Sequence, residues 1–229
     1  MANLHIQKLK ESLSKITNDN SQGEYYITDV IEIMLSEGEK VGAYVTDLEQ
    51  TMGVNDKLQL SQVGKILNRR KVEALMLAGV TIIDPDKVQV TTNVKVGRDT
   101  VLYPGTVLEG DTVIGENCVI GSNTSLNNCK VGNNTKILET VGIDSEIGSD
   151  TNVGPFAYLR PGTKVGSEVK IGDFVEVKNS TIDDGTKVAH LTYIGDADVG
   201  KRVNFGCGTV VVNYDGVNKH RTIIEDDCF

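Results

Sequence analysis

The sequence of 229 residues predicts a parallel β-helix preceded by a smaller mixed α/β segment. Three observations predict it: the composition changes near residue 87, apolar residues then recur every six positions, and glycine directly follows many of them. A period of six fits neither one helix nor one long strand, so it indicates short strands joined by tight corners. Three hexads would make one coil of a triangular prism, and the coils would stack by parallel pairing. A β-sandwich is the alternative, but irregular loops are typical of that fold.

The first 87 residues hold 10 Leu and 7 Val, which indicates helices together with some strand. A first helix is predicted from the apolar positions Leu4, Ile6, Leu9, Leu13 and Ile16. A second helix is expected over 24–35, a short strand over 41–46, and a longer helix over 58–78 that Gly79 ends. The dipeptide Asp84-Pro85 marks a turn.

Residues 88–229 hold 6 Leu and 22 Val, as expected for strands. We expect one inward-pointing residue per hexad. The six-residue spacing of these residues shifts by one position at three places. The expected inward residues are Val90, Val96, Leu102, Leu108, Ile114, Ile120, Leu126, Val131, Ile137, Ile143, Ile147, Val153, Leu159, Val165, Ile171, Val177, Ile182, Val188, Ile194, Val199, Phe205 and Val211. Residues 213–222 lack this pattern of an apolar residue followed by glycine, which predicts a loop that projects from the prism. Val217 and Ile223 still fall at the six-residue spacing. We therefore predict domains at 1–87 and 88–229.

The charge balance, 23 − 32 = −9, disfavours nucleic acid and anionic membranes as main partners. The longest nearly uncharged apolar run, residues 74–83, is too short to span a membrane. The N-terminus lacks the apolar core of a signal peptide, so a cytoplasmic location is expected. The four cysteines have no CxxC spacing, which favours free thiols.

Six motifs carry a resemblance to a known family: QGEYYITDVI (22–31), GVNDKLQLS (53–61), GPFAYLRPGT (154–163), FVEVKNS (174–180), AHLTYIGDADVG (189–200) and NFGCGTVVVNYDGVNKHRT (204–222). They resemble the bacterial bifunctional N-acetylglucosamine-1-phosphate uridyltransferases / glucosamine-1-phosphate N-acetyltransferases, the GlmU family. The resemblance implies a left-handed β-helix, a homotrimer, and acetyl transfer in clefts between neighbouring prisms. It also implies that residues 1–87 are a remnant of the uridyltransferase domain and that further coils follow Phe229, so we expect a fragment.

The family's reaction moves an acetyl group from acetyl-CoA to the amine of glucosamine-1-phosphate, which requires a base. A histidine suits that role at neutral pH, and the chain has three: His5, His190 and His220. From spacing alone, His190 is interpreted equally well as a surface histidine. Within AHLTYIGD it matches the proton acceptor of the family, and the resemblance makes it the catalytic candidate.

Arg160 and Lys178 match the family's sugar-phosphate site, although an isolated surface cation is more often merely solvated. The resemblance assigns further substrate contacts to Tyr193, Asn204, Asn213 and Lys219. Lys219 is equally compatible with a solvated loop, and each asparagine with a corner residue. Acetyl-CoA contacts carry over onto Cys207, Asn213 and Tyr214. The role of Cys207 would fall to its backbone amide, and a nucleophilic cysteine relay is disfavoured because nothing nearby predicts a lowered thiol pKa.

Asn55 matches a residue that contacts Mg²⁺ and the sugar nucleotide in the uridyltransferase site, where UTP is the second substrate. One neutral oxygen cannot hold Mg²⁺ by itself, so the sequence predicts an incomplete metal site. Two other function classes remain as alternatives. The chain could be an inert trimeric scaffold, or a zinc-dependent β-helix enzyme such as a carbonic anhydrase, which would need three converging histidines.

Overall fold

The structure, a computed structural model, describes residues 2–229, with side chains described from Ile6 onward. Met1 and the side chains of Leu4 and His5 lie outside the described part. The chain divides into two compact units, Met1–Gly53 and Val54–Phe229. The composition boundary at residue 87 therefore lies inside the second unit, and the predicted domain division stays a prediction.

The first unit is helical in its described part, with α1 (Ala2–Leu13), α2 (Asp29–Ser36) and α3 (Leu48–Thr51). The strand expected over 41–46 is wrong: these residues pair with no other segment, and Tyr44 and Val45 are each 91% exposed. A strand needs a neighbour to satisfy its backbone groups, and this segment has none among the described residues. The helix expected over 24–35 begins only at Asp29, because a tight turn bonds Asp29 N–H to the Tyr26 carbonyl at 3.1 Å.

The second unit begins with the helix α4 (Lys57–Leu77), which confirms the prediction over 58–78. The Asp56 side chain caps its N-terminus by accepting the Gln59 N–H at 2.7 Å. Gly79 follows its C-terminus with φ of +100°, a left-handed conformation that favours glycine. Among the described residues, no helix is long and apolar enough to cross a membrane.

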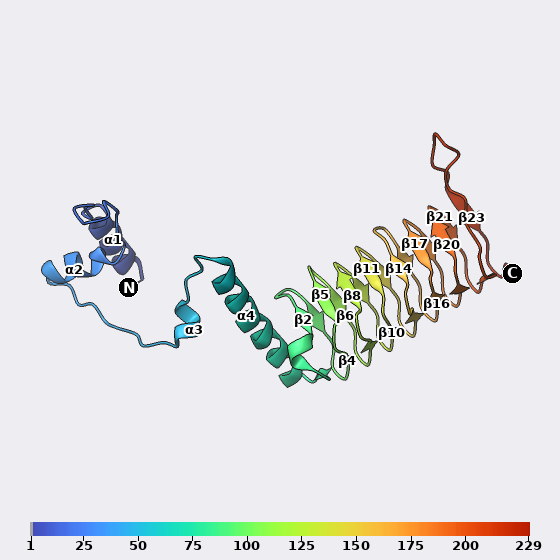
Figure 1. Cartoon of the computed structure of the whole chain (residues 1–229), viewed down its shortest axis with the longest axis horizontal. Helices are drawn as coiled ribbons and strands as arrows, with labels where there is room; N and C mark the ends of the chain where they lie inside the picture. Colours follow the sequence, from blue (N-terminus) through green and yellow to red (C-terminus); the bar gives the residue numbers. More distant parts are fainter. Residues whose placement is uncertain (1) are drawn as a thin grey trace. The chain divides into compact units, whose positions relative to one another are not determined.

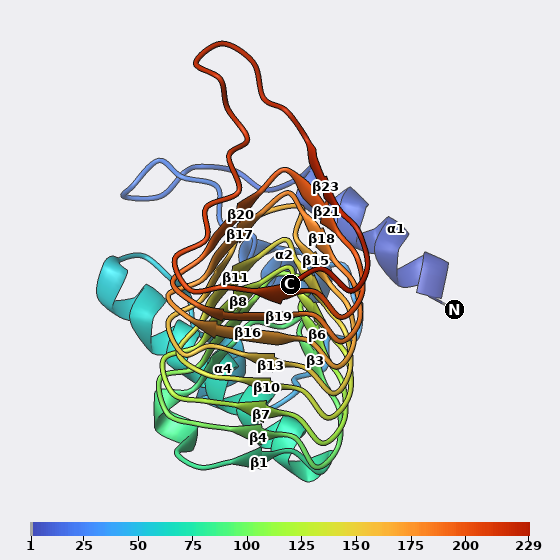
Figure 2. The same ribbon diagram turned by 90° about the vertical axis from the view of Figure 1, so that its right-hand side faces the viewer.

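A prism of three parallel sheets follows α4, and the short 3₁₀ helix η1 (Pro85–Lys87) lies between its first two strands. Figure 1 shows the coils stacked one behind another, and Figure 2 looks along them. Sheet A contains β1 (Thr81–Ile82), β4 (Val101–Leu102), β7 (Val119–Ile120), β10 (Lys136–Ile137), β13 (Asn152–Val153), β16 (Lys170–Asp173), β19 (Lys187–His190) and β22 (Asn204–Phe205). Sheet B contains β2 (Gln89–Val90), β5 (Val107–Glu109), β8 (Ser125–Asn127), β11 (Val141–Ile143), β14 (Tyr158–Leu159), β17 (Glu176–Lys178) and β20 (Tyr193–Gly195). Sheet C contains β3 (Lys95–Val96), β6 (Val113–Ile114), β9 (Lys130–Val131), β12 (Glu146–Ile147), β15 (Lys164–Val165), β18 (Thr181–Ile182), β21 (Ala197–Val199) and β23 (Thr222–Ile224).

The predicted inward residues form the core of this prism, and most are almost fully buried. Two expectations are wrong. Gly142, not Ile143, pairs with Leu126 and Leu159 in the inward column of sheet B. After the loop, Ile224 pairs with Val199, while Ile223 is 75% exposed. At Ile143 the hexad count runs one residue too far, because a shortened corner moves the preceding residue inward. At Ile223 it stops one residue short, because the long loop before β23 resets the frame.

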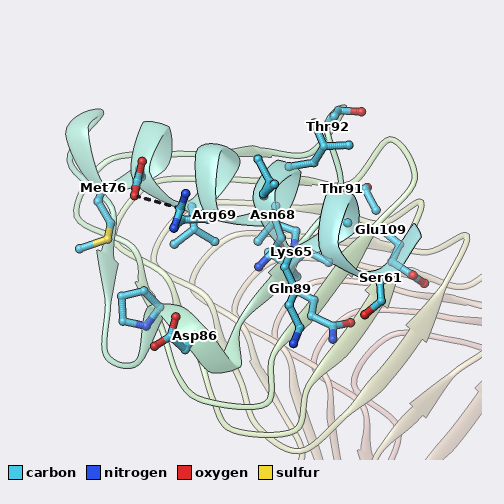
Figure 3. A pocket seen from close by; sticks show the side chains of 18 residues that line it. Ser61, Lys65, Asn68, Arg69, Met76, Asp86, Gln89, Thr91, Thr92 and Glu109 are labelled. Carbon is cyan, nitrogen blue, oxygen red and sulfur yellow. Dashed lines mark hydrogen bonds and ion pairs between the residues drawn. The ribbon is translucent and has the colours of Figure 1, made fainter. Parts of the chain in front are cut away.

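Helix α4 covers the open edge of the first coil. The Asn68 amide donates to the Val88 carbonyl at 2.9 Å and accepts the Val90 N–H at 2.8 Å, so it satisfies backbone groups that an exposed edge would leave unpaired. Val72 of α4 is 1% exposed and belongs to the core. Figure 3 shows the groove between α4 and the first coils, about 1250 Å³ in volume. The helix therefore acts as the N-terminal cap of the prism.

The segment after β22 leaves the prism as a hairpin and returns at β23, which confirms the predicted loop (Figure 2). Val210 still pairs with Tyr193 in parallel, whereas Tyr214 and Lys219 pair antiparallel within the excursion. Val217 is 82% exposed, so it keeps no place in the inward frame. We call residues 213–221 the hairpin.

Candidate active site

His190 forms a pair with an aspartate on the neighbouring coil. The strands β16 and β19 are adjacent in sheet A, with Asp173 directly opposite His190. Their side chains meet at 2.9 Å between His190 Nδ1 and Asp173 Oδ1. The two residues are seventeen positions apart, so winding by one coil brings them together.

The aspartate determines which nitrogen of the imidazole carries the proton. The hydrogen bond from His190 lowers the pKa of Asp173, so this carboxylate is ionised at neutral pH. An ionised carboxylate only accepts, hence Nδ1–H donates, and in the neutral form of the imidazole the free lone pair lies on Nε2. His190 is 58% exposed and Asp173 42%. The arrangement can remove a proton from a group that approaches Nε2.

Sheet B, which follows sheet A along the chain, presents two cations. The register that sets Leu159 opposite Val177 also brings Arg160 beside Lys178 on the following coil. The Arg160 guanidinium donates to Glu176 at 2.9 Å, and this hydrogen bond raises the pKa of Arg160. Arg160 therefore stays protonated and is held in one direction by Glu176.

The hairpin brings a third cation, Lys219, to the same place. The nearby amino group of Lys178 lowers the pKa of Lys219. Arg160 also lowers the pKa of Lys219, which sets all three cations within one electrostatic neighbourhood. Glu176 pairs with Arg160 at 2.9 Å and Asp196 with Lys178 at 3.4 Å. Three cations therefore face two carboxylates, and the remaining positive charge favours a bound anion such as a phosphate.

Asp196 holds the polar side of this cluster together. Its carboxylate accepts from Asn179 at 2.6 Å, from Asn213 at 2.5 Å and from Lys178 at 3.4 Å. The hydrogen bond from Asn179 is the main cause that lowers the pKa of Asp196. The residue is only 7% exposed, so one buried anion ties the corner, the β17 strand and the base of the hairpin together.

Tyr193 and Asn213 meet above a glycine. Asn213 donates to the Tyr193 hydroxyl at 3.3 Å. A side chain at Gly195 would clash, because its Cβ would lie 2.3 Å from that hydroxyl and 2.6 Å from Asn213 Nδ2. Glycine at this position therefore leaves room for the tyrosine and asparagine to lie against sheet B.

Cys207 lies on the coil beyond His190. The pairs Val188↔Phe205 and Tyr193↔Val210 enclose this corner, and equal spacing sets Cys207 opposite His190. Its thiol is exposed. Tyr214 is 55% exposed and bonds to the Gly216 carbonyl at 2.6 Å, within the hairpin.

Among the described residues, no hydrogen bond or ion pair joins His190, Cys207, Asn204 or Asn55 to the three cations. Asn204 lies in β22 opposite Lys187, three positions before His190 in the register. Asn55 precedes α4, at the other end of the second unit, and its backbone N–H donates to Gln59. The neighbouring Asp56 is used as the helix cap. The residues around Asn55 do not fit Mg²⁺, because they offer no set of oxygen ligands.

Elsewhere, too, no metal site is present among the residues with described side chains: no group of three or more His, Cys, Asp or Glu could hold a metal ion. His190 and His220 are each engaged with a separate aspartate, Asp173 and Asp215. The zinc-enzyme alternative therefore has no ligand set in this part of the chain.

Sequence reasoning missed four residues of this cluster: Asp173, Glu176, Asp196 and Gly195. The signal that could have found Asp173 is the coil length. Counting one coil back from His190 reaches it, and the same count from Asn213 reaches Asp196. Glu176 and Gly195 could be found only from the register of sheet B.

The chain is similar to several known proteins. A family model described as "Bacterial transferase hexapeptide (six repeats)" matches residues 93–128 and 144–179. The "Bifunctional protein GlmU" of Clostridium tetani is 54% identical over 98% of this chain and 50% of its own length. That of Clostridium perfringens (strain ATCC 13124) is 56% identical over 98% of this chain and 49% of its own length. The structure of an Arabidopsis UDP-N-acetylglucosamine acyltransferase aligns with a TM-score of 0.45 and 19% identity, over 64% of this chain and 66% of its own.

The chain thus spans about half the length of the curated relatives that it matches. The hexapeptide repeats, wound into three parallel sheets, make the fold a left-handed parallel β-helix, as the resemblance implied. The handedness is an exception to the right-handed rule for parallel crossovers.

Proposed function

Over the half of their length that it spans, the chain belongs to the family of the bifunctional GlmU proteins, and on that premise we propose that its prism transfers the acetyl group of acetyl-CoA to the amine of glucosamine-1-phosphate. The product is N-acetylglucosamine-1-phosphate. The observation that carries the proposal is the His190–Asp173 pair, one corner away from three cations.

His190 would act as the general base. Nε2 takes the proton from the substrate amine as the nitrogen attacks the thioester carbonyl, and Asp173 stabilises the imidazolium that forms. The tetrahedral intermediate then collapses as its C–S bond breaks, and the CoA thiolate leaves and takes the proton from His190. The backbone amide of Cys207, one coil beyond His190, would donate to the oxyanion of the tetrahedral intermediate.

The cations would hold the phosphate. Arg160 offers a planar fork for two phosphate oxygens, while Lys178 and Lys219 supply point charges. A bound phosphate would relieve the repulsion between the two amino groups. Tyr193, Asn204 and Asn213 remain candidates for contacts with the sugar, and Asn213 and Tyr214 for contacts with acetyl-CoA.

We also propose a homotrimer. Phe156, Phe174 and Leu191 stack in one corner column beside the His190–Asp173 pair, and the rings of Phe156 and Phe174 lie 5.4 Å apart. All three have positive φ, of 59°, 54° and 43°, and each is more than half exposed. Bulky residues adopt this conformation at a cost, and burial against a second copy would offset it. Sedimentation of the wild-type chain and of the Phe174→Asp variant tests this proposal: the variant should sediment as a smaller assembly than the wild type.

For the longer protein we propose uridylyl transfer from UTP to this product as a second reaction, with Mg²⁺ as its metal and Asn55 as one contributor to that site. The described residues around Asn55 offer no ligand set, so the second reaction would need residues outside this chain. The four free cysteines accord with a reducing, cytoplasmic location, which we propose as well. Neither nucleic acid nor membrane is proposed as a partner.

A thiol-release assay tests the acetyl transfer. The chain is incubated with acetyl-CoA and glucosamine-1-phosphate, and free CoA is measured with a thiol reagent. We expect release that His190→Ala abolishes, with an unchanged circular dichroism spectrum. Lys164→Ala, on the outer face of sheet C, is the control variant. An active His190→Ala would refute the base assignment, whereas an inactive wild-type chain that binds neither substrate would favour the scaffold alternative.

A further inference from the structure

The hairpin is built around one carboxylate, that of Asp215. Its Oδ1 accepts the backbone N–H of Val217 at 2.8 Å and of Asn218 at 2.7 Å. Its Oδ2 meets His220 Nε2 at 2.6 Å. The Asp215 N–H also donates to the Asn218 carbonyl at 3.2 Å. One side chain therefore closes the whole tip of the hairpin.

Lys219 lies between the two residues that Asp215 holds. Asn218 precedes it and is bound to Oδ1, and His220 follows it and is bound to Oδ2. Lys219 itself pairs antiparallel with Tyr214 across the hairpin. A loop of this length would otherwise sample many conformations, and ordering each residue costs free energy. Because it holds both neighbours of Lys219, the Asp215 carboxylate restricts the backbone conformations that Lys219 can adopt.

The base of the hairpin is anchored as firmly as its tip. Arg221 donates to Asp198 at 2.6 Å and to the Asn179 carbonyl at 3.1 Å, while Asn213 donates to Asp196. With both ends fixed, the direction of Lys219 depends on the tip alone. Lys178 lies at the base of the hairpin, because the Asp196 carboxylate accepts from both Asn213 and Lys178, at 2.5 and 3.4 Å. The direction of Lys219 therefore sets how its amino group lies relative to Lys178, the neighbour that most lowers its pKa.

We propose that Asp215 is a positioning residue for the sugar-phosphate site: its carboxylate clamps the hairpin so that Lys219 reaches the phosphate beside Lys178. This inference rests on the proposed function, since it assumes that glucosamine-1-phosphate binds there. Asp215 acts through Lys219 and does not touch the substrate.

A double-mutant cycle on the full chain tests the inference, with binding of glucosamine-1-phosphate measured by titration calorimetry. Lys219→Ala should raise its Kd about tenfold, as expected for losing one charged contact. Asp215→Ala should raise it by about the same factor. In the Lys219→Ala background, Asp215→Ala should add less than a twofold change, because the clamp then has nothing to position. Asp215→Asn keeps the Oδ1 acceptor and should lie between wild type and Asp215→Ala.

Asp184→Ala is the matched control. This carboxylate also accepts a backbone N–H, from Ser167 at 2.9 Å, and also pairs with a cation, Lys201 at 3.2 Å, but it lies at a corner beside sheet C. Asp184→Ala should leave the Kd for glucosamine-1-phosphate within twofold of the wild-type value.

The possible failures are distinguishable. If the wild-type chain does not bind glucosamine-1-phosphate, the proposed function falls and this inference with it. If Lys219→Ala weakens binding while Asp215→Ala does not, or if the two effects multiply in the double variant, the positioning role of Asp215 alone is overturned.

Discussion

A single methyl group between two coils should disturb both the stability and the chemistry of the prism. Gly172 lies in β16 between the core residue Ile171 and the site residue Asp173. A Cβ at Gly172 would lie 1.8 Å from the carbonyl oxygen of Ala189 on the next coil. An ordinary contact needs at least 3.4 Å, so in Gly172→Ala the coils must part by about 1.6 Å, the difference between the two distances.

The magnitude follows from the bonds that this displacement breaks. Two backbone hydrogen bonds flank Gly172, from Lys170 N–H to the Thr186 carbonyl and from Leu191 N–H to the Asp173 carbonyl, each 3.0 Å long. Each contributes about 1 kcal/mol net, and overpacking costs about 1–3 kcal/mol. We expect Gly172→Ala to lose about 3–5 kcal/mol of unfolding free energy, which lowers Tm by roughly 6–20 °C for a chain of this size.

The assay is scanning calorimetry, with Gly206→Ala as its control. Gly206 occupies the same column as Gly172 and Ala189 on a later coil, but an added Cβ would meet nothing within 4 Å. Gly206→Ala should keep the Tm of the wild type within a few degrees. Equal Tm values for the two variants would refute the steric reasoning. Turnover of Gly172→Ala should also fall, because the Asp173–His190 register lies beside the opened contact.

Three further predictions concern the candidate site. Arg160→Ala should raise the KM for glucosamine-1-phosphate about tenfold or more while Arg202→Ala does not, since Arg202 pairs with Asp227 away from the cluster; an unchanged KM would remove Arg160 from the site. Asp173→Asn should lower kcat roughly 10–100-fold with little change in KM, because the amide can also hold the wrong imidazole tautomer; steady-state kinetics with an unaltered kcat would contradict the proposed orientation. The folded hairpin lowers the pKa of Asp215 from 3.8 to about 2, chiefly through the N–H of Asn218. Its carboxylate should therefore stabilise the hairpin fully above about pH 4 and lose this contribution as pH falls through about 2; the amide NMR shifts of Val217 and Asn218 should follow this titration in the wild type but not in Asp215→Asn.

The hexad pattern was sufficient to predict the prism from sequence. One branched aliphatic per six residues forces a strand, an inward contact and a corner at each step, so period, core and architecture follow together. Leu159, Val177 and Ile194 could be assigned to the core for this reason, and all three are fully buried. The pattern failed at Ile143, where a shortened corner moves the preceding residue inward, and at Ile223, where the long loop before β23 resets the frame.

The site was predictable only in its motif residues. His190, Arg160 and Lys178 stand in motifs whose site residues could be matched to a family. Asp173 stands outside those motifs. Glu176 and Asp196 stand inside them but received no role, because each meets its partner only on a preceding or following coil. Their contacts depend on how many residues one turn contains, and this varies: Lys136 pairs with Asn152, sixteen residues on, but Asn152 pairs with Lys170, eighteen residues on. Periodicity by itself does not report that number at each corner.

The sequence by itself thus determined that this chain coils, which faces are apolar, and which motif histidine and cations are candidates for chemistry. Only the tertiary structure decided which carboxylate faces His190, that Lys219 returns to Lys178, and that Asp215 holds the hairpin tip between them. The physical reason is that burial is encoded locally, in the polarity of each residue, whereas the partner of a polar side chain is set by the register between coils.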